Sequence, residues 1–325
     1  MNLDTANRNF YGLLTLAAAP FLLAGALGCG VLTLTAYRIV TNGRTDALTG
    51  PTAIPAGLFL TAAALGALLA MRSLIVQHRA TRRLAGHLRS RWIPPTERLQ
   101  DIAAEAGLVR VNLVDDGDAY SLTFGLLRPR VVISRGLVDR SSDRELAAVL
   151  VHERYHVANL DPLKITLARA VTAGFFFLPA TNHLLSRYLA GRELNADRHA
   201  LRQCGRTAIA GALLQVVGGP TDLSLSAAAA LGGNEMLGIR IDQIETSAEP
   251  TLPSIPSHVI ALTIAGFVAV SAGLIATVIA VDTPSILNPT SGDGRIDLVG
   301  GLACAAMWTV GGLALRNHRR QPRTT

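Results

Sequence analysis

The chain has 325 residues, of which 50% are hydrophobic and only 16% charged, a balance far from that of an ordinary soluble protein. Its formal net charge is +7, but the positive residues gather beside apolar runs and only 5% of residues are aromatic. Nucleic-acid binding is therefore not expected, because it uses basic faces and aromatic stacking platforms. The three cysteines form no CxxC pair and no disulfide framework, which is typical of a reducing compartment.

Four apolar runs have the length of membrane-crossing helices, the last being somewhat shorter than the others. They cover residues 11–37, 52–71, 259–281 and 298–315. The first run is not typical of a cleaved signal peptide, because it is too long, lacks a basic segment before it and is soon followed by the second run.

The charges beside these runs predict their orientation. Seven arginines and one acidic residue, Glu97, follow the second run, and the tail RNHRRQPRTT after the fourth run is also basic. The loop DTPSILNPTSGDGRID between the third and fourth runs is acidic and rich in turn residues. By the positive-inside rule, both termini and the long segment between the second and third runs lie in the cytoplasm.

From Pro94 onward the pattern is that of a folded α+β domain. The stretch TERLQDIAAEAG predicts a helix with Thr96 as its N-cap and Gly107 as its stop. Three β-rich runs follow, bounded by turn residues. They are LVRVNLV at 108–114, AYSLTFG at 119–125 and RVVISRG at 130–136.

Ser142 and Glu145 form a capping box at the head of the next helix, which must end near Asp161-Pro162. The apolar segment 165–185 is too short for two crossings, and a single crossing would put its flanks on opposite sides of the membrane. We therefore expect a helix or helical hairpin that packs on, or dips into, the cytoplasmic leaflet. A further helix is expected from about residue 183 to residue 205.

The stretch VLVHERYH, residues 149–156, poses the question of a metal site. On a helix, His152 and His156 share one face and can bind one ion, while Glu153 can address a water on that ion. The alternative is an ordinary helix that carries two imidazoles.

Zinc would need a third protein ligand. Pro162, six residues after the second histidine, cannot serve; Asp161 is expected to end the helix, and His183 falls in the apolar segment. Glu193 lies on the following helix and can complete a His₂Glu set with one position open for water. Asp197, four residues on, shares its face and can orient a ligating imidazole. Taken alone, these two acids would be interpreted as a solvent-facing helix edge.

The pairing of HERYH with ELNAD resembles the zinc metallopeptidases that use a downstream glutamate as third ligand. The stretch AYSLTFGLLRPRVVISRGLVDRSSDRELAAVLVHERYHVANLDPLK is similar to the BlaR/MecR-type membrane metallopeptidases, and more distantly to the HtpX and CAAX-prenyl-protease group. The chain departs from BlaR-type receptors because it ends ten residues after its fourth apolar run and carries no SxxK with its accompanying motifs. Direct covalent sensing of a β-lactam is therefore not expected.

The resemblance implies a role for each matching residue. His152, His156 and Glu193 would bind one Zn²⁺ per chain, Glu153 would be the catalytic base, and Asp197 would support a ligand from behind. An extended substrate would lie against an edge strand formed by Ser121, Leu122, Thr123 and Phe124. For the oxyanion, the candidates near in sequence are His199, Arg202 and Tyr155; we favour His199, the alternative being a solvent-facing helix residue.

The predicted fold is a multi-pass α-helical membrane protein with a cytoplasmic α+β zincin-type metallopeptidase domain. The expected organisation comprises two transmembrane helices in residues 1–76, the metallopeptidase domain in 77–256, and two transmembrane helices with a basic tail in 257–325.

The expected function is zinc-dependent hydrolysis of protein substrates at the cytoplasmic face of the plasma membrane, in contact with lipid. The BlaR resemblance implies a transcriptional repressor as substrate, such as a small winged-helix protein, whereas the HtpX resemblance implies damaged membrane proteins. The alternative from another class is a non-catalytic receptor or scaffold with a structural zinc site, which would need a fourth side-chain ligand.

Overall fold

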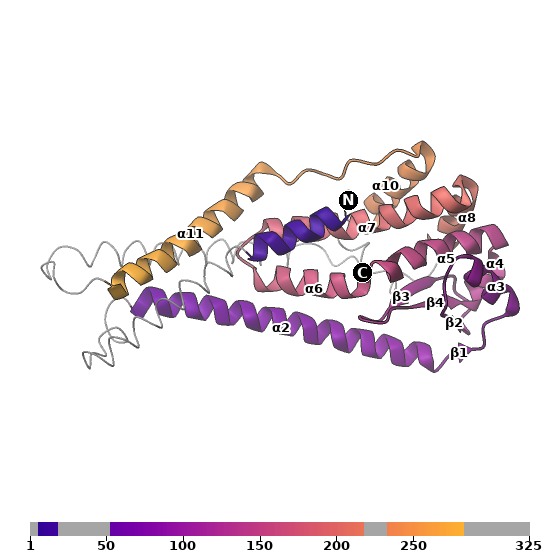
Figure 1. Ribbon diagram of the computed structural model, residues 1–325, viewed down its shortest axis with the longest axis horizontal. Helices are drawn as coiled ribbons and strands as arrows, with labels where there is room; N and C mark the ends of the chain where they lie inside the picture. The colour runs from indigo at the N-terminus through magenta and orange to yellow at the C-terminus, as the bar shows by residue number, and fades with distance from the viewer. Residues whose placement is uncertain (1–5, 19–52, 218–232, 283–325) are drawn as a thin grey trace, which may run out of the picture. The chain divides into compact units, whose positions relative to one another are not determined.

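The computed structural model describes residues 6–18, 53–217 and 233–282 (Figure 1). The described chain is mostly helical, with one small sheet. The predicted apolar run at 298–315 and most of the run at 11–37 lie outside the described residues; residues 6–18 are helical. The chain divides into two units. The first comprises Met1–Tyr11, Ser73–Arg169 and Leu184–Pro253, and the second Gly12–Arg72, Ala170–His183 and Ser254–Thr325.

The sheet belongs to the first unit and has the strand order β1-β2-β4-β3. Strands β2 and β4 are parallel, and the other two pairings are antiparallel. The strands are β1 (Trp92–Ile93), β2 (Val111–Val114), β3 (Ser121–Phe124) and β4 (Arg130–Ser134). The three longer strands lie in the predicted β-rich runs, whereas the two-residue β1 was not predicted. Strand β3 has one hydrogen-bonded neighbour in this sheet and so forms its edge.

Alternation along the strands gives the sheet two buried faces. Val131 and Ile133 of β4 are fully buried in the main core, together with Leu146 and Leu150 of helix α5 (Asp143–Ala158). Val132 points to the opposite face and packs with the end of helix α2 (Ala53–Arg89) and with strand β3. Figure 1 shows α5 lying along the sheet. Helices α3 (Glu97–Glu105), α4 (Arg135–Arg140), α8 (Arg206–Val217) and α10 (Gly233–Thr246) also contribute to this core, as does the end of helix α7 (Ala180–Cys204) through Ala200.

The helix-end signals act as predicted. The Thr96 side chain accepts a hydrogen bond from Leu99 N at the start of α3, and Gly107 follows that helix with a φ of +74°. Both halves of the capping box between Ser142 and Glu145 are present at the start of α5. Such boxes satisfy backbone N–H groups that the first turn of a helix leaves without partners.

Helix α5 ends three to four residues before the Asp161-Pro162 pair near which its end was predicted. It stops at Ala158, and helix α6 (Asp161–Gly174) begins at once. The link between them contains Leu160 with a φ of 52°, a left-handed conformation that costs a residue with a Cβ roughly 1–2 kcal/mol. This residue separates the two helices.

In the second unit, glycines permit close helix packing. A Cβ at Gly66 of α2 would lie 2.6 Å from the carbonyl oxygen of Gly174, and one at Gly266 of helix α11 (Ser257–Asp282) would lie 2.8 Å from that of Phe177. Small residues at such crossings let backbones approach, as in membrane helix pairs.

The apolar segment 165–185 forms a helical hairpin: α6 ends at Gly174, and helix α7 (Ala180–Cys204) begins after a short turn. Its position relative to a lipid leaflet stays a prediction.

Among the described residues, one helical stretch, Thr61–Arg89, is long and apolar enough to span a bilayer. Helix α11 contributes the shorter apolar stretch Ser257–Gly273. From residue 53 on, the predicted run at 52–71 lies in α2, which continues as one helix through most of the arginine-rich segment. Crossing by the other predicted runs stays a prediction.

Candidate metal centre

Two histidines of α5 and one glutamate of α7 form a compact group. Ligand atoms of His152, His156 and Glu193 all lie within 4.8 Å of one another. The two imidazole Nε2 atoms are 3.1 Å apart, and the Glu193 carboxylate lies 3.5 Å from the first and 3.8 Å from the second. The four-residue spacing on α5 puts both rings on one face of the helix, turned toward α7.

Each imidazole rests on a buried carboxylate through its other nitrogen. His152 Nδ1 lies 2.9 Å from Asp197 Oδ1, and His156 Nδ1 lies 2.6 Å from Asp161 Oδ2. The His156 contact is a hydrogen bond, which holds the proton on Nδ1 and leaves Nε2 as the ligand atom, whereas the His152 contact is an ion pair with Asp197. Both Nε2 atoms point into the group shared with Glu193.

Two supporting residues were not predicted. The sequence predicts Asp161 only as the end of a helix, whereas in the structure the left-handed turn at Leu160 places its carboxylate on His156. The Arg240 guanidinium of α10 donates two hydrogen bonds to the fully buried Asp197, from Nε to Oδ2 at 2.6 Å and from Nη2 to Oδ1 at 2.8 Å. The five-residue spacing between His156 and Asp161 could have indicated their contact. Nothing in the sequence around Arg240 indicates its contact with Asp197.

The charges of the site favour a cation. Burial would raise the pKa of Glu193, but Arg192, whose guanidinium lies 2.9 Å away, and the two imidazoles hold it well below its usual value. Burial likewise opposes ionisation of Asp197, yet Arg240 and His152 hold its pKa at about 2. Burial lowers the pKa of His152, but Asp197 and Glu193 outweigh it and raise that pKa to about 10.

These residues fit a divalent metal ion. Two imidazole nitrogens and one carboxylate are one of the ligand sets that zinc uses in sites with an open position. In the part of the chain that the structure describes, no fourth histidine, cysteine or acidic residue joins the group. A closed, purely structural zinc site would require one.

Glu153 stands apart from the three ligand candidates. Its side chain is buried, with the residue 5% exposed, and each carboxylate oxygen accepts a hydrogen bond from strand β3. Ser121 Oγ lies 2.8 Å from Oε1, and Thr123 Oγ1 lies 2.6 Å from Oε2. Leu122 and Phe124, the alternate residues, pack in the cluster on the opposite face of the sheet.

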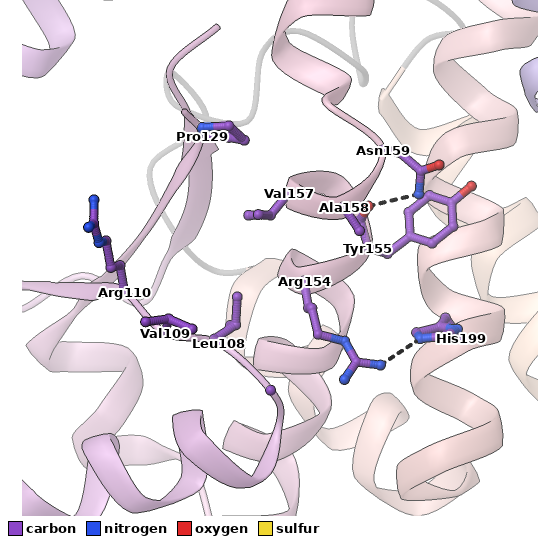
Figure 2. A pocket seen from close by; sticks show the side chains of 11 residues that line it. Leu108, Val109, Arg110, Pro129, Arg154, Tyr155, Val157, Ala158, Asn159 and His199 are labelled. Carbon is purple, nitrogen blue, oxygen red and sulfur yellow. Dashed lines mark hydrogen bonds between the residues drawn. The ribbon is translucent and has the colours of Figure 1, made fainter. Parts of the chain in front are cut away.

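His199 lies elsewhere. It lines a pocket of about 730 Å³ together with Arg154 and Tyr155, and the loop before β2 forms the opposite wall (Figure 2). Its Nε2 lies 3.0 Å from Arg154 Nη2 and 2.9 Å from Gln203 Nε2. Burial, Arg154 and Arg202 lower its pKa. The structure does not bring His199 into the ligand group, and its role at an oxyanion stays a prediction.

Comparison with known proteins gives a consistent result. A 33% identical stretch of 100 residues is shared with a protease HtpX homolog of Nitrosomonas eutropha and covers 30% of this chain and 34% of that protein. Protease HtpX of Thioalkalivibrio sulfidiphilus is 31% identical over 106 residues, 31% of this chain and 36% of the other. The plastoglobule-localized metallopeptidase 48 of Arabidopsis thaliana is 30% identical over 92 residues, 28% and 27% of the two chains.

The matched stretch spans about a third of these curated relatives. No solved structure matches significantly. A histidine–histidine–glutamate group beside a small sheet in a mostly helical chain, with these relatives, defines a metallopeptidase-type domain. The family profile described as BlaR1 peptidase M56 matches residues 45–244, and the chain belongs to that family.

Proposed function

We propose that this protein is a membrane-embedded zinc metalloendopeptidase that hydrolyses peptide bonds of protein substrates. The observation that carries the proposal is that the two glutamates, Glu193 and Glu153, occupy different positions relative to the two histidines. Glu193 joins the two histidines, whereas the buried Glu153 is held outside that group by Ser121 and Thr123. A ligand set that does not use the glutamate beside the first histidine is the arrangement that HExxH peptidases need.

In this proposal His152, His156 and Glu193 hold one zinc ion, which when bound would polarise the scissile carbonyl and lower the pKa of a water to about 7. Asp197 and Asp161 keep the two imidazoles in the ligating orientation. Glu153 accepts the proton of the attacking water as the C–O bond forms. It then donates that proton to the amine nitrogen as the C–N bond breaks.

The substrate is proposed to bind as an extended strand. Strand β3 is an edge of the sheet and carries the Glu153 contacts, so a peptide added along Ser121–Phe124 would lie beside the base. Backbone pairing of this kind tolerates many sequences. Membership of a peptidase family and the peptidase names of the relatives support peptide substrates.

The domain organisation is proposed to be two transmembrane helices in 1–76, a cytoplasmic metallopeptidase domain in 77–256 and two transmembrane helices in 257–325. The apolar stretch Thr61–Arg89 and the arginines that follow residue 71 support a plasma-membrane protein with this orientation. The boundaries between the two units at Arg72 and Pro253 lie close to these limits, although Ala170–His183 groups with the second unit.

Two substrate classes follow from the resemblances: a cytoplasmic repressor, such as a winged-helix protein, or damaged membrane proteins. Cleavage of a folded repressor at one site would favour the regulatory role. Cleavage confined to unfolded membrane proteins would favour quality control. The non-catalytic receptor or scaffold is disfavoured by the absence of a fourth ligand among the described residues.

The test compares the full chain with its Glu153→Gln variant in membranes, using fluorescein-labelled casein as an unfolded substrate. We expect both to bind zinc and the variant to cleave about 10²–10⁴-fold more slowly, the usual contribution of a general base. Removing zinc with a chelator should abolish cleavage, and adding zinc should restore it. Equal cleavage by the two forms would contradict Glu153 as base, and no bound zinc in either would contradict the metal site.

A further inference from the structure

The hydrogen bonds just before the edge strand β3 show which of its backbone N–H and C=O groups face β4 and which face the free edge. Tyr120 O accepts a hydrogen bond from Ser134 N at 3.1 Å, and Tyr120 N donates to Ser134 Oγ at 3.0 Å. The backbone of Tyr120 therefore faces β4. Because alternate residues of a strand direct their N–H and C=O groups to opposite sides, Ser121 and Thr123 direct theirs to the free edge.

The side chains of the same two residues face helix α5. Ser121 and Thr123 lie directly opposite Ile133 and Val131 of β4, whose side chains are in the core that includes α5. In this position each hydroxyl donates to a different oxygen of Glu153. A carboxylate gripped at both oxygens cannot turn about its terminal bond without breaking a contact.

We propose that Ser121 and Thr123 are positioning residues that couple the substrate to the base. Their backbone groups pair with the bound peptide, and their hydroxyls hold the Glu153 carboxylate. The inference rests on the proposed zinc peptidase and adds to it how the base is aligned with the scissile bond. A shift of the substrate strand would strain the contacts that place the base.

The chemistry of the contact suits a working base. A hydroxyl has one proton to donate, and a carboxylate oxygen has two lone pairs, so each Glu153 oxygen keeps one pair for a water proton. Thr123 is β-branched and stiff at χ1, which fixes its hydroxyl more firmly than that of a serine. Misplacement of a catalytic group by about 1 Å can cost on the order of 100-fold in rate.

The experiment uses the full chain in membranes, with fluorescein-labelled casein as the probe. Thr123→Val removes the hydroxyl and keeps the shape of the side chain, and Ser121→Ala does the same at the other position. Thr123→Ser restores the hydroxyl. Thr246→Val is the control, because the described contacts of its exposed hydroxyl are with backbone atoms alone, Asp242 O in α10 and Ala248 N just after that helix.

We expect Thr123→Val and Ser121→Ala each to lower kcat about 10-fold, and the double variant about 100-fold, with KM changed less than about twofold and bound zinc unchanged. Thr123→Ser should recover most of the lost kcat, and Thr246→Val should match the wild-type chain.

The failures are distinguishable. A double variant with wild-type kcat, or a Thr123→Ser chain no better than Thr123→Val, would overturn the positioning role and leave the zinc peptidase standing. A loss that appears in KM or in bound zinc, with kcat kept, would also overturn it. A zinc-loaded wild-type chain that leaves casein intact would overturn the proposed function and this inference together.

Discussion

At the scale of single residues, each imidazole contacts one aspartate, Asp197 of α7 for His152 and the nearby Asp161 for His156. His156 rests on Asp161, which the chain supplies five residues later, and Asp161 in turn accepts from the Tyr188 hydroxyl at 3.4 Å. In Asp161→Asn the amide still fits but the negative charge is lost. We expect zinc affinity to fall about 10–100-fold, the usual effect of losing the partner of a ligating histidine.

Competition with a zinc-binding dye measures that affinity. Tyr188→Phe, which removes only the long contact to Asp161, serves as the matched control and should change it less. An Asp161→Asn chain that binds zinc like the wild type would show that Asp161 serves the helix turn alone.

At this scale, the sequence predicts which residues lie together only where their spacing is local. The intervals from His152 to His156 and from Glu193 to Asp197 are each one helical turn, so each pair shares a face whatever the tertiary structure. The supporting contacts of Arg240 depend on how α10 packs, which no local pattern encodes. His199 was favoured on nearness in sequence, but two residues along a helix from Asp197 it points to a different side, toward Arg154.

At the scale of elements, the start of α5 can be tested with two neighbouring serines. Ser142 caps the helix, whereas the buried Ser141 Oγ has no hydrogen-bond partner in the described structure. Ser142→Ala should lower the free energy of unfolding by about 1 kcal/mol. Ser141→Ala should leave it unchanged or raise it slightly, since it removes a buried hydroxyl without a partner.

Thermal unfolding of the detergent-solubilised chain would register the loss at Ser142 as a drop of about 2–4 °C in Tm. Equal shifts for the two variants would argue against the capping box as a source of stability.

The docking of α10 is a second element-scale feature. Arg240 pairs with Asp197, and Gln243 Nε2 donates to Leu194 O at 2.7 Å, so both contacts join α10 to α7. Arg240→Met would leave the buried Asp197 carboxylate with His152 as its remaining charged contact. We expect a loss of about 1–3 kcal/mol, below that of a fully buried pair because the guanidinium is 21% exposed, together with weaker zinc binding.

Chemical unfolding with and without zinc separates these two effects of Arg240→Met. Arg206→Met is the control, since Arg206 bonds only the exposed Ser247 hydroxyl among its described contacts. Unchanged zinc affinity in Arg240→Met would restrict α10 to a packing role.

The elements that could be predicted are those with a strong local signal. Thr96, Ser142 and the alternating runs of β2 to β4 gave the start of two helices and three strands. Strand β1 was missed because two residues, Trp92 and Ile93, are too few to show an alternation. The end of α5 was misplaced because leucine at residue 160 is not a typical helix-stop residue, although its backbone is left-handed.

At the scale of the whole molecule, the proposed topology follows from charge rather than from fold. Arginines follow the apolar part of α2, and the acidic stretch around residues 282–297 separates two apolar runs. If the positive-inside rule holds, the metallopeptidase domain lies in the cytoplasm and that stretch lies outside. The test places single cysteines in a chain whose own three cysteines are replaced by serine.

Val109, 96% exposed in the folded domain, marks one side as Val109→Cys, and Ser291→Cys marks the other. A membrane-impermeant maleimide added to intact spheroplasts should label Ser291→Cys and leave Val109→Cys unlabelled until the membrane is permeabilised. Labelling of Val109→Cys in intact spheroplasts would place the zinc site outside the cell. A cytoplasmic repressor could then not be its substrate. Membrane and extracytoplasmic proteins would remain as the substrate class.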